Sequence, residues 1–168
     1  MIRSHALAVI VSISTLSRLG VAAADQLPTE AFKVLPLTLA VEAAEAAIAS
    51  CKAQGYSVTA AIVDRAGNLK VLLVGDGANA LTRELTPRKA YTAAVRRITT
   101  IEMAKAIATP GAFNPTLYDT HMVLAGGGVP IKAGNEVIGG IGVGGAPGGD
   151  KDEACANAGL AKVEAALK

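Results

Sequence analysis

Residues 126–160 read GGGVPIKAGNEVIGGIGVGGAPGGDKDEACANAGL, and this stretch decides the fold. Two runs that suit strands, 129–132 and 136–143, are separated by Gly134-Asn135, and a short break of this kind predicts a hairpin. Asp150 and Glu153 have the spacing of a helix-capping pair, so we expect a helix from Asp150 to Leu167. The stretch therefore predicts an antiparallel hairpin followed by a C-terminal helix.

The preceding part of the chain continues this pattern. We expect a helix over 38–54, a second hairpin from strands over 57–64 and 69–74, and a short strand at 123–124. Pro87 suits the first turn of a helix over 86–98, and Thr99 and Glu102 have capping-box spacing for a short helix that ends before Pro110. Strands joined by tight turns predict the α+β class, an antiparallel β-sheet with helices packed on it.

The first 24 residues have the features of a secretory signal peptide. Arg3 precedes an apolar run over 6–16, and three alanines, 22–24, give an A-x-A cleavage pattern before Asp25. The apolar run is too short to span a bilayer. We therefore expect a signal peptide over 1–24, an N-terminal arm over 25–36 and one domain over 37–168. Localisation is then periplasmic or secreted, with no membrane span after cleavage.

The charge of the mature chain excludes some classes of partner. The whole chain has 16 basic and 14 acidic residues, a formal net charge of +2. Arg3 and Arg18 leave with the signal peptide, so the mature chain has equal numbers of basic and acidic residues. This balance does not favour a nucleic acid or an anionic membrane as partner.

Cys51 and Cys155 are the two cysteines of the chain. Export makes a disulfide chemically possible, but sequence does not give the distance between the two residues. A disulfide and a pair of buried thiols therefore both stay open. Neither a thioredoxin motif nor a covalent haem attachment motif is present.

Residues 140–145, GIGVGG, match the dinucleotide-binding pattern G-x-G-x-x-G. That motif has to open a βαβ unit with an acidic residue on a further strand, and this chain ends after one more helix. We expect instead that these glycines let the strand pass close to another backbone.

Few residues have the chemistry of a catalytic or ligand-binding site. His121 is the single histidine of the mature chain, suited to acid–base chemistry, to metal ligation, or merely to a structural hydrogen bond. Tyr91, Glu102 and Asp119 are further acid–base candidates, and no cluster indicates a protein-bound metal. The basic residues of the second helix either bind carboxylates or form a solvated face. These residues are Arg88, Lys89, Arg96 and Arg97, and the spacing of seven or eight positions predicts that Lys89, Arg96 and Arg97 share one face of the helix.

Three segments resemble the GlcG/HbpS family of haem-binding-like proteins with a DUF336-type domain. They are VTAAIVDRAGNL (58–69), KAYTAAV (89–95) and the stretch 126–160 quoted above. The resemblance implies a profilin-like sheet with helices on its faces, and homo-oligomers. It also implies haem as cofactor, with Tyr91 and Thr92 at the ligand site. Relatives carry a phenylalanine and a Pro-Thr pair after this helix, where the present chain has Arg96-Arg97-Ile98-Thr99-Thr100.

The leading hypothesis is thus an exported, oligomeric protein that binds haem or another tetrapyrrole, in haem handling or redox sensing. Its cofactor-binding candidates are Lys89, Tyr91, Thr92, Arg96 and His121. The first alternative is a metal-free lyase, isomerase or hydrolase acting on a small molecule, with catalytic candidates His121, Tyr91, Glu102 and Asp119. The second alternative is an accessory oligomer without a ligand.

Overall fold

The computed structural model describes residues 31–168, and the expected signal peptide lies outside this range. Residues 32–168 form one compact unit. Its elements are α1 (Leu37–Ala53), β1 (Thr59–Asp64), β2 (Leu69–Val74), α2 (Ala80–Arg96), α3 (Thr100–Ile107), β3 (Gly128–Ala133), β4 (Glu136–Gly144) and α4 (Gly149–Val163). Two short 3-10 helices, Pro115–Leu117 and Glu164–Ala166, complete the list. No helix of the described residues is long and apolar enough to cross a membrane.

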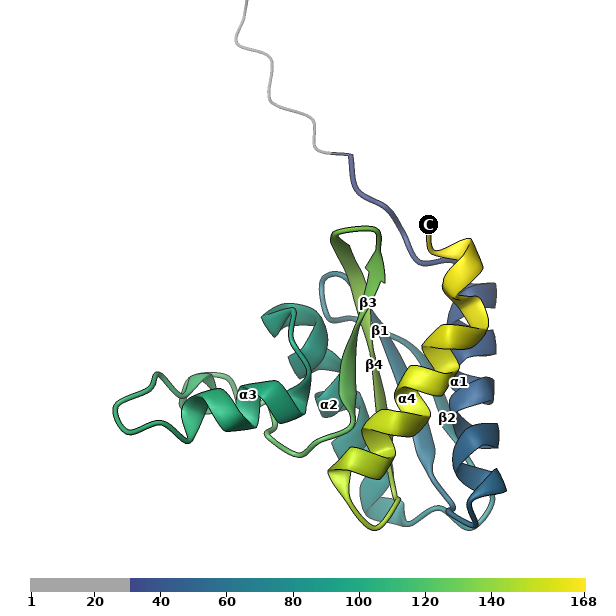
Figure 1. Cartoon of the computed structure of the whole chain (residues 1–168), viewed down its shortest axis with the longest axis horizontal. Helices are drawn as coiled ribbons and strands as arrows, with labels where there is room; N and C mark the ends of the chain where they lie inside the picture. Colours follow the sequence, from purple (N-terminus) through teal and green to yellow (C-terminus); the bar gives the residue numbers. More distant parts are fainter. Residues whose placement is uncertain (1–30) are drawn as a thin grey trace, which may run out of the picture. The chain divides into compact units, whose positions relative to one another are not determined.

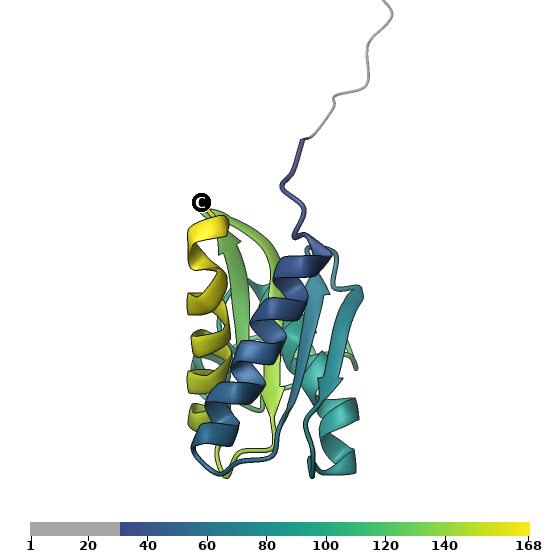
Figure 2. The same ribbon diagram turned by 90° about the vertical axis from the view of Figure 1, so that its right-hand side faces the viewer.

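The four strands form one antiparallel sheet in the order β2-β1-β4-β3. Helices α1 and α4 pack together on one face, and α2 covers the other face over β1, β4 and β3 (Figures 1 and 2). The larger core cluster lies between the sheet and the α1–α4 pair, whereas a small cluster of Ala61, Val63, Ala90 and Ala94 lies under α2. The predicted α+β class and antiparallel sheet are confirmed.

Glycines of β4 allow α2 to approach the sheet closely. A Cβ atom at Gly140 would collide with the main-chain oxygen of Ala90, and one at Gly142 with that of Thr86. The GIGVGG run therefore serves helix packing on the sheet, as expected, and does not open a nucleotide-binding βαβ unit.

Cys51 and Cys155 form a disulfide between α1 and α4, with a Cα–Cα distance of 5.6 Å. Their positions on neighbouring helices follow from the packing of α1 against α4 on one sheet face. The structure thus settles the alternative that the sequence left open.

Several predicted boundaries were wrong. Helix α2 begins six residues before the predicted start because Asn79 caps it, its side chain accepting a hydrogen bond from the Leu81 amide. Helix α4 begins at Gly149, so Asp150 lies in its first turn and is not its cap. Residues 123–124 form no strand, because the Val123 amide donates to a threonine side chain on α2 instead of to a neighbouring strand.

Residues 100–126, here called the projection, comprise α3 and the segment that returns from it to β3. Figure 1 shows the projection extending away from the sheet on the side of α2. The capping box predicted at Thr99 and Glu102 is present at the start of α3, where both reciprocal hydrogen bonds form.

Candidate functional site

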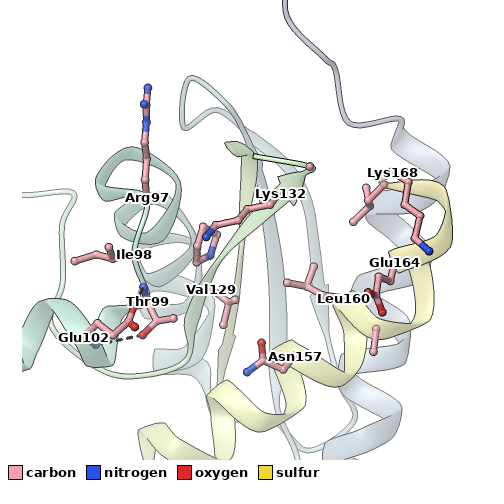
Figure 3. Close-up of a pocket in the computed structure, with 14 residues that line it drawn as sticks. Arg97, Ile98, Thr99, Glu102, Val129, Lys132, Asn157, Leu160, Glu164 and Lys168 are labelled. Atoms are coloured by element: carbon pink, nitrogen blue, oxygen red, sulfur yellow. Dashed lines mark hydrogen bonds between the residues drawn. The ribbon is translucent and has the colours of Figure 1, made fainter. Parts of the chain in front are cut away.

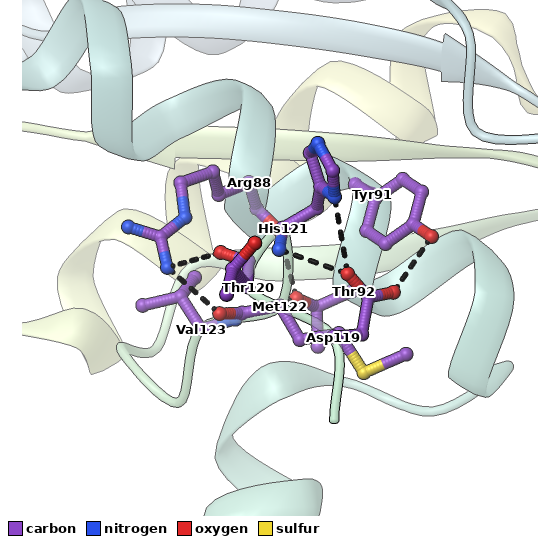
Figure 4. A network of polar contacts seen from close by, with 8 residues as sticks. All are labelled: Arg88, Tyr91, Thr92, Asp119, Thr120, His121, Met122 and Val123. Atoms are coloured by element: carbon purple, nitrogen blue, oxygen red, sulfur yellow. Dashed lines mark hydrogen bonds and ion pairs between the residues drawn. The ribbon is translucent and has the colours of Figure 1, made fainter. Parts of the chain in front are cut away.

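Asp119, at the base of the projection, joins two of the residues that the sequence nominated (Figure 4). Its Oδ2 accepts a hydrogen bond from the Tyr91 hydroxyl at 2.8 Å. Its Oδ1 lies 3.1 Å from His121 Nδ1 and accepts the His121 amide at 2.9 Å. The Tyr91 and His121 rings are 5.8 Å apart between centroids. One carboxylate therefore fixes both rings on the outer side of α2.

The segment 119–123 is held on α2 by hydrogen bonds to its main chain. Thr92 Oγ1 accepts the Val123 amide at 2.9 Å and donates to the Arg88 carbonyl at 2.8 Å. One guanidinium nitrogen of Arg88 donates to the carbonyl oxygens of Thr120, at 2.8 Å, and Met122, at 2.9 Å. Figure 4 shows Arg88, Tyr91 and Thr92 close to this segment. The helix thus sets the position of His121.

The protonation states within this group follow from its hydrogen bonds. The His121 amide, and then the Tyr91 hydroxyl, hold the pKa of Asp119 below its ordinary value, because both stabilise the carboxylate. The same bond to Asp119, with burial as a smaller cause, raises the pKa of Tyr91. At neutral pH Asp119 is therefore a carboxylate and Tyr91 a neutral phenol, and neither is suited to be a general base.

His121 is the residue of this group that solvent reaches. Its side chain is 79% exposed, against 27% for the side chain of Asp119. With Nδ1 directed at the carboxylate, the outward Nε2 is the nitrogen able to bind a ligand. A carboxylate behind an imidazole is the arrangement that orients metal-binding histidines and raises their basicity.

The four other nominated residues lie away from this group or already have hydrogen-bond partners. Lys89 is buried between α2 and α4, where its Nζ donates to Asp152 Oδ2 at 2.8 Å and to the Val143 carbonyl at 2.9 Å. The idea of Lys89 on one cationic face with Arg96 and Arg97 was therefore wrong. Thr92 is buried with its hydroxyl fully engaged, and Glu102 belongs to the α3 capping box. Arg96 is exposed in the last turn of α2.

The partner of Lys89 was missed by the sequence reasoning. Asp152 lies between Asp150 and Glu153, the two residues whose spacing predicted a helix cap, and that pattern assigns no role to Asp152. An acidic residue at a position facing the core would have been the signal, because buried carboxylates need a partner. Asp152 Oδ1 also accepts the Ala146 amide at 2.9 Å, so it fixes the loop before α4.

A second concave region is a groove of about 1000 Å³ at the β3 side of the sheet (Figure 3). Val129, Lys132 and Leu160 line it together with the α2–α3 connection, where Arg97 has a left-handed backbone. The lining contains the basic residues Arg97, Lys132 and Lys168 and the acidic residues Glu102 and Glu164. This mixed lining favours no single class of charged ligand. No group of three or more metal-ligating side chains occurs anywhere in residues 31–168.

The comparisons with known proteins agree with this fold. The family model described as "Haem degrading protein HbpS-like" matches residues 35–161. A crystal structure of HbpS is 40% identical, with a TM-score of 0.74, over 83% of this chain and 97% of that chain. A double mutant of HbpS from Streptomyces reticuli is 38% identical over the same shares, with a TM-score of 0.71.

More distant structures share the fold at lower identity. The Klebsiella pneumoniae protein ORFY, of the DUF336 family, is 26% identical with a TM-score of 0.74, over 83% of this chain and 99% of its own. A PduOC:heme complex is 26% identical with a TM-score of 0.71, over 77% of this chain and 95% of that chain. Among curated proteins, none matches the chain.

Proposed function

The chain belongs to the HbpS-like family, and from this premise we propose that it is an exported, homo-oligomeric haem-binding protein in which His121 ligates the iron. The observation that carries the proposal is the exposed His121 ring anchored by Asp119. The heme complex of PduOC and the haem-degrading description of the family both support haem as the ligand class.

The donor set of this chain fits haem. A porphyrin already holds its iron through four nitrogens, so one imidazole from the protein, that of His121, would be enough to hold it. Haem would supply the iron and its redox chemistry, while Asp119 would keep the His121 ring oriented. Arg96 lies one helical turn beyond Thr92 and is exposed, and this exposure supports the proposal that it pairs with a carboxylate group of the porphyrin.

Apolar side chains precede this site in the projection. The rings of Phe113 and Tyr118 stack with their centroids 5.4 Å apart. Leu117, which precedes Tyr118 in the sequence, is 75% exposed. Exposed apolar side chains that lie together are a feature of binding surfaces. We propose that these side chains form the surface against which the porphyrin, or a neighbouring subunit that covers the porphyrin, would pack.

The alternative of a metal-free acid–base enzyme has less support. It requires Tyr91 or Asp119 to exchange a proton near neutral pH, but the pKa of Tyr91 is raised and that of Asp119 is lowered. Only His121 of the nominated residues would then remain for catalysis.

Export rests on two observations. Residues 1–24 have the order of features of a signal peptide, and Cys51 and Cys155 form a disulfide. Disulfides persist in the periplasm and outside the cell, whereas the cytosol keeps most thiols reduced. N-terminal sequencing of the protein from the periplasmic or culture fraction tests this part: a chain that begins near Asp25 is expected, and an intact Met1 would overturn it.

Haemin titration of the mature protein tests the ligand. We expect a saturable Soret band, its loss in His121→Ala, and its recovery when imidazole is added to that variant. Asp119→Asn should weaken binding about 10- to 100-fold because the ligand loses its orienting partner. Lys132→Ala, an exposed change on β3, is the matched control and should titrate like the wild type. A wild-type protein without a Soret shift would refute haem binding, and an unchanged His121→Ala titration would refute the ligand assignment.

A further inference from the structure

The two edges of the sheet differ in how they are protected. Strand β3 forms one edge and β2 the other, and no further strand among residues 31–168 pairs with either. An open edge presents main-chain N–H and C=O groups that bind another strand unless a proline, a charge or a cover prevents it.

The β3 edge carries such protection. The main-chain N–H and C=O groups of Val129 and Ile131 point toward β4. Those of Gly128 and Pro130, which alternate with them, therefore point outward. The Gly128 amide is already bonded to Thr100 Oγ1 at 2.9 Å, and Pro130 has no N–H to offer. This edge is therefore closed to strand addition.

The β2 edge has no proline and no covering segment among residues 31–168, and its one charged residue, Lys70, lies near the start of the strand. The Gly75 amide donates to the Val58 carbonyl at 3.0 Å, so Gly75, Leu73 and Val71 direct their main-chain groups toward β1. Leu72 and Val74 alternate with these residues, so their main-chain N–H and C=O groups point away from β1, toward the open edge. Among the described residues nothing bonds to these outward groups. The Leu72 and Val74 side chains are also 36% and 48% exposed.

We propose that β2 pairs antiparallel with β2 of a second copy across a two-fold axis at Leu73. In this register Leu72 of each copy lies opposite Val74 of the other, so both outward-facing residues form hydrogen-bonded pairs. The same register brings Lys70 of each copy near Asp76 of the other, which lies in the turn after β2. The edge is thus complementary to itself in hydrogen bonds, apolar side chains and charge, which is the property a two-fold interface requires.

The pairing joins two four-stranded sheets into one of eight strands and covers apolar surface. Val71 and Leu73 pack toward the α1–α4 side, so Leu72 and Val74 point to the opposite side, where α2 does not cover them. Pairing these side chains across the axis removes them from water. The inference gives the subunit contact for the self-association included in the proposed function, and it does not depend on haem.

A disulfide crosslink tests the register. At a non-hydrogen-bonded pair on the axis the two Cα atoms lie about 4.5 Å apart, within reach of a disulfide. Leu73→Cys should give a covalent dimer under mild oxidation, sensitive to reductant. Leu69→Cys is the matched control, because the two copies of residue 69 would lie roughly 27 Å apart in this register. A Leu73→Cys variant that crosslinks no better than Leu69→Cys would overturn the proposal.

A charge exchange tests the same contact without altering the core. Lys70→Glu and Asp76→Lys should each lower the dimer fraction in sedimentation velocity at low salt, and the double variant should restore it. Single variants that associate like the wild type would refute the pairing. Haemin titration of the same variants is expected to be unchanged, so failure of this interface and failure of haem binding give different results.

Discussion

Glu153 on α4 combines burial with incomplete hydrogen bonding. Its Oε2 is buried without a partner. Burial is the largest cause that raises the pKa of Glu153, and the nearby Glu102 carboxylate raises it further against a hydrogen bond from Thr99. A carboxyl with a raised pKa in the folded protein destabilises the fold when it is ionised.

We therefore predict that Glu153→Gln stabilises the protein at pH 7, by up to about 1 kcal/mol. The gain should disappear as the pH falls through the raised pKa toward about 4, where the wild-type carboxyl is protonated and its cost is gone. Urea unfolding at both pH values measures this. Glu45→Gln, an exposed change on α1, should have little effect, and a Glu153→Gln gain that is equal at pH 4 and pH 7 would contradict the explanation.

At the same scale, the sequence identified side chains better than their surroundings. It nominated Tyr91, Asp119 and His121 separately, and the structure joins them through one carboxylate. Asp119 Oδ1 contacts the amide and ring of His121 two residues later, and its Oδ2 accepts from Tyr91, 28 residues away on α2. Helical spacing grouped Lys89 with Arg96, but spacing gives only relative angles about the helix axis. Which side of α2 faces the interior depends on the sheet, and that side contains Lys89.

The Lys89–Asp152 pair links helices on opposite faces of the sheet. The side chains are only 4% and 5% exposed, and both make additional hydrogen bonds, to the Val143 carbonyl and from the Ala146 amide. Removing one partner of a buried pair leaves an unpaired charge, whereas removing both leaves none.

We predict that Lys89→Met alone, or Asp152→Leu alone, lowers the free energy of unfolding by about 3–5 kcal/mol. In the double variant, the free energy of unfolding should fall by much less than the sum of the two single losses. Chemical unfolding of all four proteins measures this as a double-mutant cycle. The exposed pair Lys162–Glu42, with its charged atoms 3.9 Å apart, is the control, and Lys162→Met should cost less than about 1 kcal/mol. Additive effects of the two core changes would show that the pair is not coupled.

Among the elements, local signals predicted type better than extent. Both hairpins and the α3 capping box followed from turn and cap residues. The start of α2 did not, because Pro87 suits a first turn yet lies inside this helix, where Asn79 supplies the cap. Residues 123–124 have strand-forming side chains, but the Val123 amide donates its hydrogen bond to Thr92 on α2, 31 positions away in the sequence.

For the whole molecule, topology decides the fate of the two cysteines. Sequence placed them on helices at opposite ends of the chain, 104 residues apart, and gave no distance between them. The sheet order brings the first and last helices together on one face, so the two residues meet. A crosslink between such distant positions restricts the unfolded chain strongly.

Replacing both cysteines with alanine should therefore lower the free energy of unfolding by about 4 kcal/mol. The variant should still fold, because α1 and α4 keep their apolar contacts with the sheet and a domain of this size forms its own core. Urea unfolding and far-ultraviolet circular dichroism measure the two effects. The wild type under reductant is the control and should show the same loss. If reduction left the stability unchanged, the disulfide would not restrain the unfolded chain, and its support for export to an oxidising compartment would fall with it.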